Sequence, residues 1–190
     1  MTSDAFQRLP LLSPIQLRDD QQRVYQAIVE GPRQGSPGLT DANGCLRGPF
    51  NAMLYSPAIG GLIEALGAAI RYKSSFSDRV RELAILTVAA YCNSEFEWVN
   101  HEPLALKCGW RPEQLRAIRE SREPEIEDPD ELVTWRVVAQ LLTVGDLGDQ
   151  EYQRAFDRLG PTALVELSTL IGYYRLLALQ LRIFQIPVDQ

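Results

Sequence analysis

The sequence is poor in residues that bind metals or form cross-links. It has one histidine, His101, and three cysteines, Cys45, Cys92 and Cys108, which show neither a CxxC pair nor a zinc-like spacing. An odd number of cysteines in this arrangement argues against a disulfide framework and against a structural metal site. We therefore expect a protein of a reducing compartment, without a metal.

Lysine is also scarce, and positive charge does not dominate. Lys73 and Lys107 are the only lysines, and the net charge of the 190 residues is −6. Proteins that follow nucleic-acid phosphates or bind anionic membranes need a clustered positive field. The composition therefore excludes nucleic acid and membrane as expected partners and leaves small molecules and other proteins.

A continuous apolar run of membrane-spanning length is not evident. The opening MTSDAFQRLPLLSPIQL carries prolines and charges where a secretory signal has an apolar core. No later run is expected to reach the roughly 20 apolar residues of a membrane span. The expected location is the cytoplasm.

Strand signals are nearly absent, whereas apolar residues recur at intervals of three and four in almost every patterned segment. The fold class is therefore all-α, and we expect one domain over residues 1–190. Within it, residues 1–50 form an N-terminal helix and arm, and residues 51–190 form a helical core. About eight helices are predicted, at residues 14–30, 57–72, 77–93, 95–108, 112–120, 131–144, 149–159 and 161–184.

The segment from Gly31 to Gly48 is rich in glycine and proline and is longer than most connections in compact domains. Such loops are usually functional lids or disordered tethers. Because the following GPFNAMLYSP is apolar and should be held in place, we expect an ordered arm or lid.

The helix at residues 77–93 contains LAILTVAAYC, ten residues without a charge. A helix that is apolar on all sides belongs in the centre of a bundle or at a subunit interface. Asn93 and Ser94 then offer a break before the helix at residues 95–108. We expect these two helices to form the central hairpin of the fold.

Three acid or base groups can meet along this hairpin. Glu97 and His101 lie one helical turn apart on a shared face. From the turn, Glu82 lies about 16 Å down the first helix and His101 about 11 Å down the second, at 1.5 Å per residue. The difference is within reach of a glutamate side chain or a bridging water. A carboxylate beside His101 would raise its pKa and give an acid–base group suited to proton transfer.

Other interpretations of the same residues remain open. A histidine beside a glutamate is commonly a structural pair, and one histidine with two carboxylates can also hold a metal ion. Nucleophilic catalysis by Ser94 with His101 as base is the weakest alternative. Trp98 is more typical of packing, and Cys92 of a small core residue.

The stretch RELAILTVAAYCNSEFEWVNHEPLALKCGW resembles the core hairpin of the carboxymuconolactone decarboxylase family, which includes the AhpD-like alkylhydroperoxidases. The similarity extends to GPFNAMLYSPAIGGLIEALGAAIRYKSSFSDR before it and LGPTALVELSTLIGYYRLLALQLRIFQIPV after it. The resemblance implies an AhpD-like helical bundle, homo-oligomers with sites near subunit interfaces, and no organic cofactor. A trimer or hexamer is the expected assembly, with a dimer as the alternative.

The chain departs from the peroxidase branch of that family at two positions. The branch has a glutamate, a CxxC pair and then a histidine; Glu82 and His101 match the first and last of these. Ser94 and Glu97 stand where the two cysteines would be. A thiol peroxidase needs a reactive cysteine and a resolving partner, so this activity is disfavoured.

The expected function is a cofactor-independent acid–base enzyme of the decarboxylase type, acting on a small oxygenated carboxylate or lactone. His101 would be the general acid or base, Glu82 its orienting or relay partner, and Glu97 a second proton carrier. The predicted substrate-binding residues are Ser94, Arg81, Arg71, Arg47, Trp98 and Cys92, of which the arginines would pair with a substrate carboxylate. The alternative is a non-catalytic oligomeric binding or scaffold protein with the same fold; a metal-dependent enzyme is less favoured.

Overall fold

The computed structural model describes residues 8–36 and 38–188, which form eight α-helices and one short 3₁₀ helix but no strand. Thr40 and Leu46 form an isolated antiparallel bridge. The all-α prediction is confirmed. Contacts group the chain into two compact units, residues 1–72 with 179–190 and residues 73–178. The expectation of a single domain stays a prediction.

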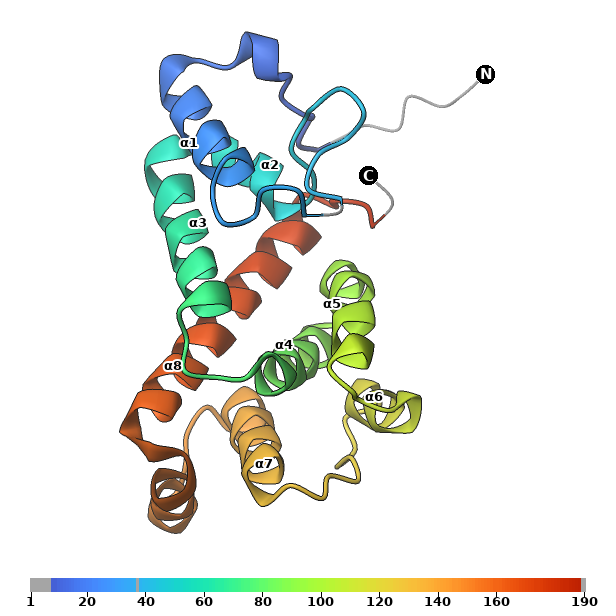
Figure 1. Ribbon diagram of the computed structural model, residues 1–190, viewed down its shortest axis with the longest axis vertical. Coiled ribbons are helices and arrows are strands. Elements are labelled where there is room, and N and C mark those ends of the chain that lie inside the picture. Colours follow the sequence, from blue (N-terminus) through green and yellow to red (C-terminus); the bar gives the residue numbers. More distant parts are fainter. Residues whose placement is uncertain (1–7, 37, 189–190) are drawn as a thin grey trace. The chain divides into compact units, whose positions relative to one another are not determined.

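The first unit contains three helices that pack on one another, α1 (Asp19–Val29), α2 (Pro49–Tyr55) and α3 (Pro57–Tyr72) (Figure 1). Helices α2 and α3 approach so closely that a Cβ on Gly60 would lie 2.0 Å from the carbonyl oxygen of Met53. Glycine is therefore required at that crossing. The core of this unit comes from apolar side chains of the helices and the loop before α2, including Val24, Ile28, Leu46, Met53, Leu54 and Ile70.

One prediction for this unit is wrong, and one helix of the unit is absent from the predictions. The helix expected from Pro14 is only a 3₁₀ turn (Pro14–Gln16), and α1 begins at Asp19. The hydroxyl of Ser13 makes no capping bond, whereas the Arg18 N–H donates to Gln21 Oε1 at 3.0 Å and two aspartates occupy the first turn. These acidic groups favour a start at Asp19. Helix α2 was not predicted, because seven residues are too few to show a helical period.

The glycine-rich arm is ordered over its described residues. The Tyr25 hydroxyl donates to the Gly44 carbonyl at 2.9 Å, and Asp41 Oδ1 accepts from the backbone N–H of Asn43 and Cys45 at 2.8 Å each. These bonds, with the burial of Leu46, hold the arm within the first unit. The expectation of an ordered arm is confirmed for these residues, and its role as a lid stays a prediction.

The second unit is built on α4 (Asp78–Cys92), which contacts α5 (Glu95–Lys107), α6 (Pro112–Arg119) and α7 (Pro129–Thr143) (Figure 1). Every α4 residue from Arg81 to Ala89 is buried, so the helix predicted to be central is central to this unit. Its apolar core includes Leu83, Leu86, Trp98, Trp110, Leu115 and Trp135.

Helix α8 (Asp149–Ile183) is interrupted at Gly160, where φ is 77° and the backbone is not helical. Pro161 follows and starts the second half, as the sequence predicts. By length and composition alone α8 could cross a membrane, but the buried core helix of a soluble protein has the same properties. Glu166 and Arg175 interrupt its apolar residues, so the expectation that no continuous apolar run has membrane-spanning length is not contradicted.

Candidate active site

The turn between α4 and α5 fixes the register of the site. Ser77 Oγ accepts the Val80 N–H at 3.2 Å and caps the start of α4. Asn93 ends α4 in the left-handed region at φ 51°, and the Ser94 N–H donates to the Ala89 carbonyl at 2.9 Å. Both helix boundaries match the sequence prediction. Because the turn is short and hydrogen-bonded, the two helices run back along each other from a fixed point.

Glu82 and His101 meet directly across this hairpin. Glu82 Oε2 lies 2.6 Å from His101 Nδ1, and both side chains are buried. The contact needs no bridging water. The expected convergence of the two residues is confirmed, since the difference in their distances from the turn is taken up by the glutamate side chain.

Glu97 approaches the opposite edge of the same ring. Its Oε2 lies 3.5 Å from His101 Nε2, one turn along α5. Because the ring nitrogens face different carboxylates, a doubly protonated His101 donates from Nδ1 to Glu82 and directs its Nε2 proton toward Glu97. The contact with Glu97 is the looser of the two.

The environment of His101 determines its charge. Burial alone lowers the pKa of His101, but hydrogen bonding and charge interaction with Glu82 and Glu97 outweigh it and raise the pKa to about 9. At neutral pH the ring is therefore an imidazolium held between two carboxyl groups.

Arg81 is the predicted arginine that reaches this cluster. Its Nε lies 3.8 Å from Glu82 Oε1, and its guanidinium bonds Asp78 at 2.8 Å. The Arg81 side chain is buried, and its Nε makes no hydrogen bond with any described group. Its charge contributes to the balance of Glu82.

The other predicted residues of this hairpin lie around the cluster in different ways. Ser94 is buried at the start of α5, and its hydroxyl makes no capping bond. Trp98 packs in the apolar core, with Arg119 stacked over its ring at 4.9 Å. Cys92 ends α4 and is partly buried. Their assignment to substrate binding stays a prediction.

Arg47 and Arg71 belong to the first unit. The Arg71 guanidinium lies 6.0 Å from the ring of Tyr72, and Arg47 Nε is buried without an acceptor among the described residues. Their assignment to substrate binding also stays a prediction.

Tyr174 is a neighbour of His101 but is not among the predicted site residues. Its ring stands edge-on to the imidazole, with centroids 5.5 Å apart, and Tyr173 packs edge-on against Tyr174 at 5.3 Å. The apolar period of α8 marks both tyrosines as buried. It gives no sign that Tyr174 meets the histidine, because that contact depends on how α8 packs.

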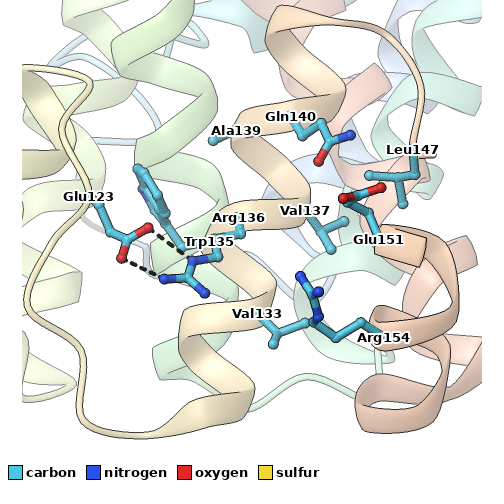
Figure 2. A pocket seen from close by; sticks show the side chains of 10 residues that line it. All are labelled: Glu123, Val133, Trp135, Arg136, Val137, Ala139, Gln140, Leu147, Glu151 and Arg154. Atoms are coloured by element: carbon cyan, nitrogen blue, oxygen red, sulfur yellow. Dashed lines mark hydrogen bonds and ion pairs between the residues drawn. The ribbon is translucent and has the colours of Figure 1, made fainter. Parts of the chain in front are cut away.

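A surface pocket of about 380 Å³ lies in another part of the second unit, along α7 and the start of α8 (Figure 2). Arg136 donates two hydrogen bonds to Glu123 at its edge, at 2.9 and 2.7 Å. None of the ten residues that line it is a predicted site residue. The lining comprises Glu123, Val133, Trp135, Arg136, Val137, Ala139, Gln140, Leu147, Glu151 and Arg154.

The cluster at His101 does not suit a metal ion. Among residues 8–36 and 38–188, no group of three or more histidine, cysteine, aspartate or glutamate side chains is arranged to hold one. Glu82 and Glu97 face opposite nitrogens of the ring, so a single ion at either nitrogen would be separated from the other carboxylate by the ring.

Comparison with known proteins supports the fold and the family resemblance. Residues 57–140 match the carboxymuconolactone decarboxylase family. Five solved chains match the structure. One is an uncharacterized peroxidase-related protein from Silicibacter sp. TM1040, with a TM-score of 0.72 and 12% identity, over 94% of this chain and 88% of that one. No curated protein matches the sequence.

The solved structure agrees with the fold class, which is AhpD-like and all-α. The family match spans α3, α4, α5, α6 and most of α7 and therefore includes Glu82, Glu97 and His101. The match to the carboxymuconolactone decarboxylase family over residues 57–140 agrees with the resemblance of the hairpin.

Proposed function

We propose that this protein is a cofactor-independent acid–base enzyme of the carboxymuconolactone decarboxylase type. It acts on a small oxygenated carboxylate or lactone, by decarboxylation or by related lyase or isomerase chemistry. The observation that carries the proposal is the buried Glu82–His101–Glu97 cluster inside the family segment. Buried, charge-coupled groups with a strongly shifted pKa are typical of functional sites.

In this proposal His101 acts as the acid. With a pKa of about 9 it carries two protons at neutral pH, and Glu82 holds the Nδ1 side of the ring at 2.6 Å. The Nε2 proton, in the looser contact with Glu97, is the one available to a substrate. Loss of carbon dioxide leaves an enolate, which this proton can stabilise on oxygen or quench on carbon.

Glu97 completes the acid–base pair as the proton acceptor. Its carboxyl group is buried beside Nε2. Glu97 would therefore accept a proton from the substrate on the same side of the imidazole from which His101 donates one. Glu82 keeps the ring oriented and balances its charge. This division of roles requires neither a metal nor an organic cofactor.

Two of the three cysteines, Cys45 and Cys108, do not favour a thiol peroxidase. Burial, together with the nearby carboxyl groups of Glu82 and Asp78, raises the pKa of the Cys108 thiol. Burial and Asp41 raise the pKa of the Cys45 thiol. A raised pKa reduces the thiolate fraction on which peroxide reduction depends.

The test is turnover of a panel of small lactones and carboxylates by the wild type and by His101→Gln, Glu82→Gln and Glu97→Gln. We expect losses of roughly 100-fold or more in kcat from removal of an acid–base group. Glu95→Gln, at an exposed position of the same helix, is the matched control and should retain activity. Full activity in all three site variants would refute the assignment.

The second candidate is a non-catalytic oligomeric binding or scaffold protein, and an exposed apolar stripe on α3 favours it. Ile59, Leu62 and Leu66 are 60, 74 and 42% exposed at helical spacing. Such a stripe suits self-association into the proposed trimer, hexamer or dimer. A stable oligomer without turnover, whose single histidine titrates at its ordinary pKa in NMR, would support this candidate over the enzyme.

A further inference from the structure

Two serines stand at the N-cap positions of neighbouring helices, and only one of them caps its helix. Ser77 Oγ accepts the Val80 N–H at 3.2 Å at the start of α4, whereas the Ser94 hydroxyl makes no capping bond at the start of α5. Serine is favoured at an N-cap because of that bond. Ser94 is only 9% exposed, so its hydroxyl is largely removed from water and is not used to cap the helix.

The second bond of a capping box is missing as well. Ser94 and Glu97 have the spacing of such a box, in which the glutamate at the third helical position accepts the N–H of the serine. Here the Ser94 N–H donates to the Ala89 carbonyl at 2.9 Å, and Glu97 directs Oε2 toward His101. A local rule that is broken without a structural gain is expected at a functional site.

Ser94, Glu97 and His101 all lie on the buried face of α5. At about 100° per residue, seven residues bring Ser94 and His101 to within about 20° of each other around the helix, with Glu97 between them along its axis. Because His101 Nε2 faces Glu97, the available proton lies on the side of the ring nearer the start of α5. The Ser94 hydroxyl and this proton therefore border the same part of the site.

We propose that Ser94 is a further catalytic residue, whose hydroxyl donates a hydrogen bond to the enolate oxygen that forms on the substrate. The inference rests on the proposed function, since it concerns the intermediate of that reaction. When the bond to the substrate carboxylate breaks, its electron pair passes into the neighbouring carbonyl group, and carbon dioxide leaves. Ser94 stabilises the negative oxygen and keeps its own proton. His101 Nε2 delivers a proton to carbon, and the ring regains one from water.

Tetronic acid, a lactone that is an enolate at neutral pH, can test this contact without any turnover. It is titrated into the full-length protein by calorimetry. We expect Ser94→Ala to weaken its binding about tenfold, because a hydrogen bond to a charged oxygen is lost. Ser94→Thr keeps a hydroxyl and should bind tetronic acid as the wild type does.

Ser77→Ala is the matched control, because it removes the serine that does cap its helix. It should lower the urea midpoint of unfolding and leave the affinity for tetronic acid unchanged, whereas Ser94→Ala should show the opposite pattern. Three results would each overturn the inference: equal affinity of the wild type and Ser94→Ala, no binding to the wild type at millimolar concentration, or a loss of stability in Ser94→Ala as large as that in Ser77→Ala. Failure of Ser94→Ala to fold counts as the last of these.

Turnover separates this inference from the proposed function. On a panel compound that the wild type converts, Ser94→Ala should lower kcat about 100-fold, as expected for the loss of a donor to an oxyanion. An unchanged kcat would overturn the inference and leave the proposed function intact. Weaker binding of tetronic acid by Ser94→Ala, without turnover of any panel compound by the wild type, would disprove the proposed function and leave the contact between Ser94 and an enolate standing.

Discussion

Two glutamate–cation pairs of the second unit have nearly the same length and different surroundings. Glu82 and His101 are 2.6 Å apart, with side chains 2 and 8% exposed. Glu123 and Arg136, beside the pocket in Figure 2, are 2.7 Å apart and about half exposed, at 47 and 50%. Distance is therefore a poor guide to what a pair does.

The difference lies in what water does to each pair. Hydrogen bonds from Arg136 lower the pKa of Glu123, but water and salt screen a pair at this exposure. At His101 water is excluded, so removal of one partner leaves a buried charge that only a looser contact compensates, Glu97 in the case of His101 and Arg81 in the case of Glu82. The buried pair can shift the pKa of a group that transfers protons, whereas the exposed pair chiefly holds the loop before α7 against that helix.

The largest expected effect comes from breaking the buried pair. Glu82→Gln removes the carboxylate that balances His101, so the variant should lose about 3 to 5 kcal/mol of unfolding free energy at pH 7. The pKa of His101 should fall, because burial then opposes a single carboxyl group. Urea unfolding and an NMR titration of the histidine measure the two effects, and wild-type values in both would mean that the pair is not formed in solution.

The second prediction concerns the pH dependence of stability. The pKa of His101 is about 9 in the folded protein against 6.5 ordinarily, so the folded state holds the proton more tightly. The stabilisation is complete below pH 6.5 and is lost as the pH rises through 9, a change of roughly 3 kcal/mol.

Urea unfolding at pH 6 and pH 9.5 tests this, with His101→Gln as the reference that lacks the titrating group. The wild type should lose more stability than the variant between the two pH values. Parallel losses would show that another group is responsible.

The smallest effect is expected at the exposed pair. Glu123→Gln should cost about 0.2 to 1 kcal/mol, and the loss should diminish in high salt because the pair is screened. Thermal unfolding at low and high ionic strength provides the measurement. A loss as large as that of Glu82→Gln would show that exposure does not separate the two pairs.

The geometry of the buried pair could be predicted because local signals set it. Ser77 and Asn93 mark the ends of α4, and the rise per residue then brings Glu82 and His101 to similar depths. Gly160 likewise marks the break in α8. Each of these signals acts within a few residues, so a single sequence contains it.

Other features depend on packing between distant segments and could not be predicted. The sequence offers Arg47, Arg71 and Arg81 as equal candidates, and only the fold shows that Arg81 lies beside Glu82. The contact of Tyr174 with His101 has no local signature. Pro14 gives a convincing helix start, but capping at Arg18 overrides it.

The left-handed residue Asn93 has a consequence for how the site can change. Inserting one residue beside it would rotate α5 by about 100° relative to α4 and turn His101 away from Glu82. Substitutions at positions 94 and 97 leave the turn length and the helix register unchanged. The hairpin therefore tolerates replacement of the side chains around the histidine far better than any change in its length, and new chemistry can arise there by point substitution alone.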